Sequence, residues 1–279
     1  MTAPRLTVVA TPIGNLEDLS PRAAAALRDA DLIACEDTRR TRILTQHVGA
    51  HAEVMSVHQH NEAERTATIL ERVRSGDSVV LVSDAGMPSV SDPGARVVAA
   101  AHAADLEVSV IPGPSAVTSA IAAAGMAERA FAFVGFFPRK ATELRQLLDA
   151  YDGLRVALVG FESPNRVTRL LELLAERDPD REITICRELT KLHEEIIRCP
   201  AGEAAEKLGT TVRGEVTLVL APAVAAEEAP DLRPALRLLA QSGVGARASA
   251  KIVAALGAAS KNAAYAAALE LARESESAP

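Results

Sequence analysis

The sequence lacks the patterns that mark secreted and membrane proteins. It has only three cysteines, which lie far apart and match neither a disulfide framework nor the ligand spacing of a zinc site: Cys35, Cys186 and Cys199. No basic segment precedes an apolar stretch at the N-terminus, and no apolar run approaches the roughly 20 residues of a membrane span. We therefore expect a protein of a reducing compartment, the cytoplasm, with no membrane partner.

Common nucleotide-binding motifs are also missing. No G-x-G-x-x-G follows the first predicted strand, and the chain has no P-loop lysine motif, which argues against an extended dinucleotide and against a nucleoside triphosphate. His58 and His60 have no third ligand of matching pattern nearby, so we predict no metal site. The glycines are instead spread over separate loops, a pattern that suits a ligand folded into a cleft.

The net charge of −7 argues against a protein that coats nucleic acid, but the charge is unevenly distributed. From Pro230 onward six Lys and Arg residues face four Asp and Glu residues, so this tail carries +2 and residues 1–229 carry −9. An acidic body with a mildly basic tail is compatible with an enzyme whose tail assists docking, although it does not require one.

Short β-branched runs alternate with longer helical patterns, which predicts an α/β fold with a mainly parallel, buried sheet and helices on its faces. The first set of predicted strands is Leu6–Ala10, Asp31–Cys35, Glu53–Val57, Ser78–Val82 and Glu107–Ile111. The second set is Phe131–Phe136, Arg155–Phe161, Arg181–Cys186, Glu195–Cys199 and Glu215–Leu220. Helices are expected to start at Ser20-Pro21, at Asn61 with Glu64 as a capping box, at Thr142 and at Pro164.

The turn Pro112-Gly113-Pro114-Ser115 marks the predicted boundary between two α/β domains, 1–114 and 115–222, with Ser115 capping a helix that runs to Ala124. Pro222–Pro230 has the composition of a linker. Beyond it, residues 231–274 are predicted to form a small helical module with two helices, Arg247–Leu256 and Lys261–Ala272.

The segment LVSDAGMPSVSDPG at 81–94 is the strongest functional signal. An apolar strand stops at Ser83-Asp84-Ala85-Gly86, where a carboxylate beside glycine suits a ligand crevice at the edge of an α/β sheet. Asp92-Pro93-Gly94 is interpreted as an ordinary helix start, with Asp92 as N-cap and Pro93 at the first helical position.

Three further loops follow predicted strands of the first domain: 11–15, 36–42 and 112–115. Arg39, Arg40 and Arg42 follow Glu36-Asp37 at a strand end, where they either dock a phosphate or form a solvated helix face. In the second domain, Phe131 and Phe133 are expected in the core. Phe136 and Phe137, before Arg139 and Lys140, are placed to stack on a base.

These loops, in this order, resemble the 16S ribosomal RNA cytidine 2′-O-methyltransferase family, a branch of the tetrapyrrole methylase superfamily. The resemblance spans nearly all of 9–220 through VATPIGNLEDLSPRA (9–23), CEDTRRTR (35–42), HNE (60–62), the 81–94 segment, IPGPSAVTSAIAAAG (111–125), FVGFFPRK (133–140), FESPNR (161–166) and RELTKLHEE (187–195). It implies two α/β domains with S-adenosylmethionine in the cleft between them. It also implies a homodimer that methylates a ribose in the decoding region of 16S ribosomal RNA in the 30S subunit.

Carried across by motif, the resemblance implies cofactor contacts for Pro12, Ile13, Gly14, Asp84, Ala85, Gly86, Met87, Ser115 and Ala116. It implies RNA contacts for Arg39, Arg40, Arg42, Phe137, Arg139, Asn165 and Arg166. The tail resembles the helical module of the family but is more alanine-rich and less basic, which argues against a strong RNA-binding role.

One position departs from the family pattern. Asn165 stands where a histidine is common after Glu-Ser-Pro, so we place no proton transfer there. The hydroxyl must still lose a proton during metal-free methyl transfer, and the open choices for the base are Glu162, Glu188 and Lys191. Two other functions stay open: methylation of a tetrapyrrole or corrin precursor, and a non-catalytic ribosome-binding protein that keeps the fold.

Overall fold

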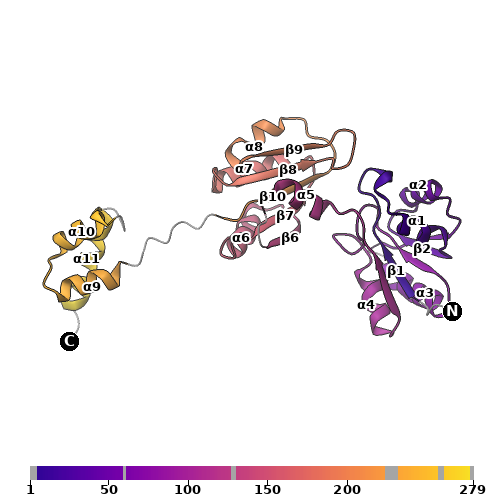
Figure 1. Ribbon diagram of the computed structural model, residues 1–279, viewed down its shortest axis with the longest axis horizontal. Helices are drawn as coiled ribbons and strands as arrows, with labels where there is room; N and C mark the ends of the chain where they lie inside the picture. Colours follow the sequence, from indigo (N-terminus) through magenta and orange to yellow (C-terminus); the bar gives the residue numbers. More distant parts are fainter. Residues whose placement is uncertain (1–4, 59–60, 127–129, 224–231, 257–260, 277–279) are drawn as a thin grey trace. The chain divides into compact units, whose positions relative to one another are not determined.

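The computed structural model describes residues 5–58, 61–126, 130–223, 232–256 and 261–276. The chain divides into two compact units, Met1–Ala223 and Val224–Pro279 (Figure 1). The first unit contains two five-stranded sheets, so the α/β fold is confirmed. The boundary of the two domains at 114/115 and the module bounds of 231–274 stay predictions.

The first sheet has the strand order β3-β2-β4-β1-β5, and all its strand pairs are parallel. Its strands and helices are β1 (Arg5–Val9), α1 (Pro21–Arg28), β2 (Leu32–Cys35), α2 (Thr38–Val48), β3 (Glu53–Ser56), α3 (Glu62–Arg74), β4 (Val79–Leu81), α4 (Ala95–Ala103) and β5 (Glu107–Ile111), with a short 3₁₀ turn at Leu16–Asp18. The predicted parallel sheet and the positions of its five strands are confirmed, to within one residue at each end.

Alternate side chains of these strands face opposite sides, because successive residues of a strand point in opposite directions. Leu32 and Ala34 of β2 belong to the core cluster that includes residues of α3 and α4, whereas Ile33 and Cys35 belong to the cluster that includes residues of α1 and α2. Two helices therefore cover each face, as Figure 1 shows. Covered on both faces, β2 and β4 consist entirely of buried residues, which explains their unbroken apolar runs.

The second sheet has the order β6-β7-β10-β8-β9, with β6 and β7 parallel and the other pairs antiparallel. Its elements are α5 (Ala116–Ala124), β6 (Phe131–Phe136), α6 (Ala141–Asp152), β7 (Ala157–Glu162), α7 (Val167–Arg177), β8 (Glu182–Arg187), β9 (Glu195–Pro200), α8 (Ala201–Leu208) and β10 (Val216–Leu220). Residues of α6, α7 and α8 share one core cluster, and residues of α5 pack on the other face. All five strands lie where the sequence predicts them, to within two residues.

A bulge in β6 separates neighbouring phenylalanines. Phe133 pairs with Val159 and Phe136 pairs with Phe161, so three residues of β6 match two of β7, and Gly135 has a φ of 70°. The extra residue reverses the inward and outward pattern of the strand. Phe136 is therefore 58% exposed while Phe137 is 1% exposed in the core.

Several helix starts differ from the predictions. Ser20 caps α1 as expected, by accepting a hydrogen bond from the Ala23 amide. Asn61 precedes α3 but its side chain points backward, accepting from the His58 amide and donating to the Ser56 carbonyl, so the predicted capping box is wrong. Ser115 occupies the N-cap position of α5 without a side-chain cap bond.

Two starts predicted at prolines are also wrong. Helix α4 begins at Ala95 after Gly94, whose φ is 122°, so Asp92 is not its N-cap. Helix α7 begins at Val167 rather than at Pro164. In both cases the proline lies in an irregular turn before the helix, which allows nearby side chains to face away from the helix.

The second unit contains α9 (Arg233–Gln241), α10 (Ala246–Ala255) and α11 (Lys261–Glu276), which share a small core around Leu236 and Val253. The sequence predicts only the last two helices. It misses α9 because Pro234 and the adjoining linker composition indicate a loop. The structure places Pro234 in the first turn of α9, where proline is tolerated. The linker Pro222–Pro230 lies largely outside the described residues.

A candidate cofactor and substrate cleft

The loops after β1, β2 and β4 meet at the carboxyl edge of the first sheet. Thr11 and Gly86 exchange two backbone hydrogen bonds, with N···O distances of 2.9 and 3.1 Å. The Asp84 carboxylate accepts a hydrogen bond of 2.9 Å from the Asp37 amide. These loops come together because the carboxyl ends of parallel strands all lie at the same edge.

A cavity of about 350 Å³ opens beside these loops. Six residues predicted to contact the cofactor line it: Ile13, Ala85, Gly86, Met87, Ser115 and Ala116. The second sheet contributes Phe136, Phe161 and Glu162, and the loop before β10 contributes Glu215. The volume falls within the range of small-molecule sites, roughly 300–1,000 Å³.

A second cavity of about 260 Å³ adjoins the first and shares Ile13, Ala85 and Glu215 with it. The three remaining residues predicted to contact the cofactor line this smaller cavity, namely Pro12, Gly14 and Asp84. Arg40 and Lys191 also line it, so it has cationic side chains on its wall. The nine predicted positions are therefore brought together, but they are divided between two neighbouring cavities.

The β8–β9 loop packs closely against the turn at Gly14. A Cβ atom on Gly14 would lie 2.5 Å from Lys191 Cγ and 2.8 Å from Thr190 Oγ1, so only glycine allows this approach. Thr190 Oγ1 is buried and has no hydrogen-bond partner among the described residues. Thr190 is not among the residues that line the two cavities, whereas its neighbours Gly14 and Lys191 line the smaller one.

Strained backbone is concentrated around the cavities. Among the described non-glycine residues with positive φ, four lie in the two loops that flank them: Ser89, Ser91, Glu188 and Thr190. Such conformations cost free energy and persist where the surrounding structure enforces them, which is common at functional sites.

The three residues proposed as bases are all in ion pairs. The Glu162 side chain is 1% exposed, lies 2.9 Å from the Arg166 guanidinium and accepts a 2.7 Å hydrogen bond from the Ser163 amide. Lys191 Nζ lies 2.8 Å from Glu188 and 2.9 Å from Glu215. Each candidate base thus faces a group of opposite charge.

For two of the candidates, the ion pairing shifts the pKa in the direction that makes the group a poorer proton acceptor. The hydrogen bond from Lys191 lowers the pKa of Glu188, although partial burial acts in the opposite direction. Burial acts to lower the pKa of Lys191, but hydrogen bonds to Glu188 and Glu215 outweigh it and raise that pKa above its ordinary value. A carboxylate with a lowered pKa and an ammonium with a raised pKa are both poor proton acceptors near neutral pH.

The arginine run lies at the start of α2. Asp37 caps the helix and binds the Arg39 guanidinium at 2.9 Å, and these hydrogen bonds lower the pKa of Asp37 to about 2. Arg40 Nε lies 3.7 Å from Asp84, on the wall of the smaller cavity. Arg42 is exposed on the helix surface. Of the three arginines, only Arg40 lines a cavity.

Two predictions for the aromatic run are wrong. Phe137 is packed in the core of the second sheet, so it cannot stack on a base. Phe131 was expected in the core but is 41% exposed on the edge strand β6. Within the aromatic run, Phe136 lines the larger cavity, and its ring packs edge-on against Phe161, another lining residue, with centroids 5.7 Å apart.

The remaining positions assigned to RNA lie near the surface. Arg139 and Asn165 are exposed, and Arg166 is partly buried, donating a 2.8 Å hydrogen bond to the Phe137 carbonyl besides pairing with Glu162. Their contact with RNA stays a prediction. Sequence reasoning missed Asp92 as a cavity residue, because Asp-Pro-Gly is also the pattern of a helix start.

The described residues contain no group of three His, Cys, Asp or Glu side chains arranged to hold a metal ion. Of the two histidines considered as a pair, His60 lies outside the described residues. No helix in the described ranges is long and apolar enough to cross a membrane. All three cysteines are buried and free.

Comparison with known proteins places these features in a family. Relatives from three bacteria are named Ribosomal RNA small subunit methyltransferase I. The protein of Mycobacterium bovis is 40% identical over 91% of this chain and 90% of its own length, and that of Escherichia coli O157:H7 is 38% identical over 95% of both chains. The protein of Thermotoga maritima is 42% identical over 77% of this chain and 97% of its own length.

Solved structures share the fold at low sequence identity. A diphthine synthase matches with a TM-score of 0.62 at 18% identity, over 78% of this chain and 89% of its own. A uroporphyrin-III C-methyltransferase from Thermus thermophilus, complexed with S-adenyl homocysteine, matches with a TM-score of 0.55 at 22% identity, over 78% of this chain and 97% of its own. The family profile of Tetrapyrrole (Corrin/Porphyrin) Methylases matches residues 5–205, and the chain belongs to this family.

Proposed function

We propose that this protein uses S-adenosylmethionine to methylate ribosomal RNA of the small ribosomal subunit. The main support is the set of relatives at about 40% identity, which cover most of the chain and carry that activity in their names. The two adjoining cavities support it independently, because methyl transfer needs a donor and an acceptor held side by side. The finer assignment, to the ribose 2′-hydroxyl of a cytidine in the decoding region, is part of the proposal.

The larger cavity fits the cofactor by its chemistry. Its wall is mostly apolar, yet it carries three carboxylates and no Lys, Arg or His among the described residues that line it. The bound cofactor supplies a methyl group on a positively charged sulfonium, and a carboxylate-rich wall of low polarity favours such a cation. Gly86 has a φ of 81° and its Cβ position lies only 3.4 Å from Ile13, so a side chain there would be strained and would narrow the cleft.

The cationic part of the smaller cavity fits the acceptor strand, while Pro12, Gly14 and Asp84 on its wall stay assigned to the cofactor. Arg40 and Lys191 on its wall, with Arg39 and Arg42 on the exposed surface of α2, provide positive charge for backbone phosphates. Arg139 adds a further positive charge on an exposed segment of the second domain, and the exposed Asn165 offers a neutral amide for hydrogen bonding. In this arrangement the chain orients the acceptor hydroxyl toward the larger cavity, on the order of 3–3.5 Å from the reacting carbon in a near-attack geometry.

The function is tested with 30S subunits from a strain that lacks this modification, incubated with the purified protein and S-adenosylmethionine labelled in its methyl group. We expect label in 16S ribosomal RNA, resistant to alkaline cleavage at one nucleotide because its 2′-oxygen is methylated. Label in a precorrin substrate but none in 30S subunits would contradict the proposal. So would cofactor binding without any methyl transfer, which is the behaviour of a non-catalytic ribosome-binding protein.

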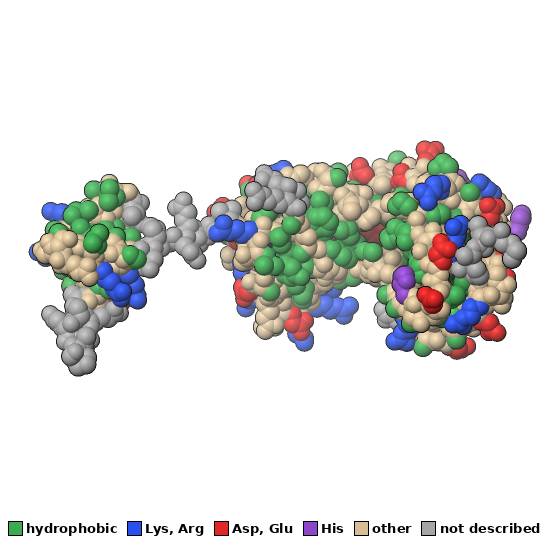
Figure 2. Space-filling model, turned by 60° about the horizontal axis from the view of Figure 1, so that its bottom comes forward, with side chains coloured by type: hydrophobic (Ala, Val, Ile, Leu, Met, Phe, Trp, Pro, Cys, Tyr) green, Lys and Arg blue, Asp and Glu red, His purple; other side chains and the backbone are tan. Residues whose placement is uncertain are grey.

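We also propose that the protein is a homodimer that associates through the edge of the second sheet. Phe131 and Phe136 of the edge strand β6 are 41% and 58% exposed. Figure 2 shows apolar side chains gathered on the surface in the region of β6. Exposed apolar residues on an unpaired strand edge are typical of an association surface.

Replacing Phe131 with glutamate is expected to convert the dimer to a monomer, because a charge would be buried at the centre of the apolar surface. The mass measured by light scattering after gel filtration should fall by half. The matched control is Leu238→Glu, an equally drastic change at an exposed leucine of α9 that should leave the mass unchanged. A monomeric wild-type protein, or a dimeric F131E variant, would argue against this surface.

A further inference from the structure

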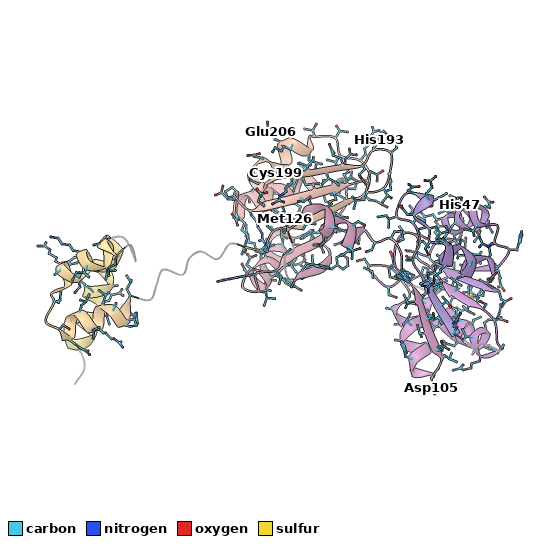
Figure 3. All side chains as sticks on the ribbon, in the orientation of Figure 1. His47, Asp105, Met126, His193, Cys199 and Glu206 are labelled. Atoms are coloured by element: carbon cyan, nitrogen blue, oxygen red, sulfur yellow. The ribbon has the colours of Figure 1, made fainter. Side chains whose placement is uncertain are left out.

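Leu192 is an apolar side chain whose position the fold does not explain. It lies in the loop 188–194 between β8 and β9 and is 93% exposed. No other large apolar side chain in the described part of the chain is exposed to this degree. Figure 3 shows the next residue, His193, on this loop. Single exposed leucines are common on protein surfaces, so the meaning of this one depends on where its loop lies and how the loop is held.

The loop leaves the second sheet at the edge that faces the cavities. Arg187 at the end of β8 is in register with Val216 of β10, and Val216 is in register with Glu162 at the end of β7. Both Val216 and Glu162 line the larger cavity. Lys191 lines the smaller cavity, so Leu192, the next residue, lies beside the proposed acceptor site.

Contacts on both sides fix the conformation of this loop. Lys191 Nζ lies 2.8 Å from Glu188 and 2.9 Å from Glu215, and the Glu188 amide donates a 3.0 Å hydrogen bond to the Glu215 carbonyl. The Thr190 amide donates a 2.6 Å hydrogen bond to the Glu194 carboxylate. Glu188 and Thr190 have positive φ values of 51° and 67°, which persist only where the surroundings enforce them. The exposed leucine is therefore held on a fixed support.

The charges around the loop are compatible with RNA. Glu188 is paired with Lys191, and Glu195 lies 2.9 Å from the Arg187 guanidinium. These ion pairs reduce the repulsion that the two carboxylates would exert on phosphates. On the wall of the smaller cavity, the Arg40 side chain is 61% exposed and supplies positive charge for a phosphate.

The smaller cavity suits a single unstacked nucleotide. Its volume of about 260 Å³ is too small for a base-paired helix. Ile43, which is 60% exposed, lines the cavity three residues after Arg40 on α2, so the two side chains are neighbours on the helix. An apolar side chain beside a guanidinium matches a base beside a phosphate. The acceptor hydroxyl must also come within about 3–3.5 Å of the methyl carbon, which requires the target nucleotide to leave its stack in the RNA.

We propose that Leu192 inserts into the RNA stack at the gap left by the target nucleotide and thereby keeps that nucleotide extruded, an inference that rests on the proposed function. Proteins that open base steps insert apolar side chains such as leucine, isoleucine or phenylalanine between them. Extrusion costs free energy because stacking is lost, and contact with an apolar side chain on a fixed loop offsets part of that cost. Leu192 acts here as a positioning residue and does not touch the reacting atoms.

Replacing Leu192 with alanine is expected to lower the single-turnover rate of methyl transfer to saturating 30S subunits on the order of 10-fold or more. A smaller fraction of the bound RNA then has its target nucleotide in place. Cofactor affinity, measured by calorimetry, should not change, because Leu192 lines neither cavity. Leu192→Met keeps a long apolar side chain and should retain most of the rate.

The matched control is Leu154→Ala. Leu154 is also an exposed leucine, at 63%, and it precedes β7, so it lies at the edge of the second sheet opposite to Glu162 and the cavities. This variant should methylate at the wild-type rate. Melting temperatures of both alanine variants should equal that of the wild type, because substitutions at exposed positions change stability little.

Extrusion can be measured without methyl transfer. For this, 30S subunits are reconstituted with 2-aminopurine next to the nucleotide that the wild-type protein methylates, and the protein is added together with S-adenosylhomocysteine. Stacking quenches the fluorescence of 2-aminopurine, so the wild-type protein and Leu192→Met should raise the fluorescence several-fold. Leu192→Ala should not. A full rise in fluorescence with Leu192→Ala would contradict the proposed insertion, even if its rate were low.

The remaining outcomes separate this inference from its alternatives. A change of molecular mass in Leu192→Ala, measured by light scattering, would assign Leu192 to contact with a second copy of the chain and overturn its role on RNA. A wild-type rate in Leu192→Ala would overturn the inference while the wild-type arm still showed methyl transfer. No label in the wild-type arm would overturn the proposed function and this inference with it.

Discussion

Replacing Arg166 with methionine is expected to lower the free energy of unfolding by about 3 kcal/mol, because it leaves the buried carboxylate of Glu162 without its ion-pair partner. That side chain is 1% exposed and lies 2.9 Å from the Arg166 guanidinium. Removing one partner of a buried pair typically costs about 3–5 kcal/mol. We expect the lower end of this range because the Arg166 side chain is 28% exposed, so water can partly replace it. The Phe137 carbonyl also loses its 2.8 Å hydrogen bond.

The measurement is chemical denaturation of the single variants Arg166→Met and Glu162→Gln and of the double variant. The double variant should be more stable than Arg166→Met alone, because it no longer contains an unpaired buried charge. Arg169→Met is the matched control, in the first turn of α7, the helix that Arg166 directly precedes. Its partner Glu172 is half exposed and its own side chain is 64% exposed, so its loss should cost at most about 1 kcal/mol. Equal losses at Arg166 and Arg169 would show that the Glu162 pair is not effectively buried.

Replacing Asp84 with alanine is expected to abolish measurable binding of S-adenosylmethionine, a loss on the order of 100-fold or more. Its carboxylate accepts a 2.9 Å hydrogen bond from the Asp37 amide and lies 3.7 Å from Arg40, so it connects the loops after β2 and β4. Hydrogen bonds to a charged group contribute roughly 1.5–3 kcal/mol each. Loss of this bond frees the start of α2, which carries Arg40, and removes negative charge beside the proposed cofactor cavity.

Calorimetric titration with the cofactor checks this result. Asp31→Ala is a matched control, because the Asp31 carboxylate accepts a 2.8 Å hydrogen bond from the Ser78 amide in the same way. Asp31 precedes β2, so it lies at the opposite edge of the same sheet. Both variants should lose similar stability, but only Asp84→Ala should lose cofactor binding. Unchanged affinity for the cofactor in the Asp84 variant would contradict the assignment of Asp84 to the cofactor site.

Much of the site could be predicted because its parts follow strands of a parallel sheet. The apolar runs that end at Thr11, Glu36 and Ser83 fix where the chain leaves the sheet, and parallel pairing brings these exits to one edge. The nine cofactor positions are implied by the family resemblance, and all of them line one of the two cavities. Which cavity each position lines depends on the β8–β9 loop, because this loop packs against Gly14. No pattern in the local sequence predicts that contact.

The errors share a different cause, because each depended on a choice that local sequence leaves open. Asp92 and Ser163-Pro164 fit the pattern of a helix start, yet both helices begin later. Phe136 and Phe137 are adjacent, and the local sequence does not show which of the two faces the core. The bulge at Gly135 decides that Phe136 reaches the cavity and Phe137 the core, and a one-residue shift of register reverses every side chain that follows.

The sequence by itself determined the α/β fold, the order of the strands along the chain and the segments that form the cleft, because these depend on hydrophobic periodicity and on residues with strong turn preferences. The tertiary structure decided the charge pairing. Glu162, Glu188 and Lys191 were equal choices for a base until their ion pairs were seen. Asp92 was interpreted as a helix cap, and only the folded turn around it shows that it lines the larger cavity. Protonation depends on neighbours distant in sequence, and only the folded chain brings them together.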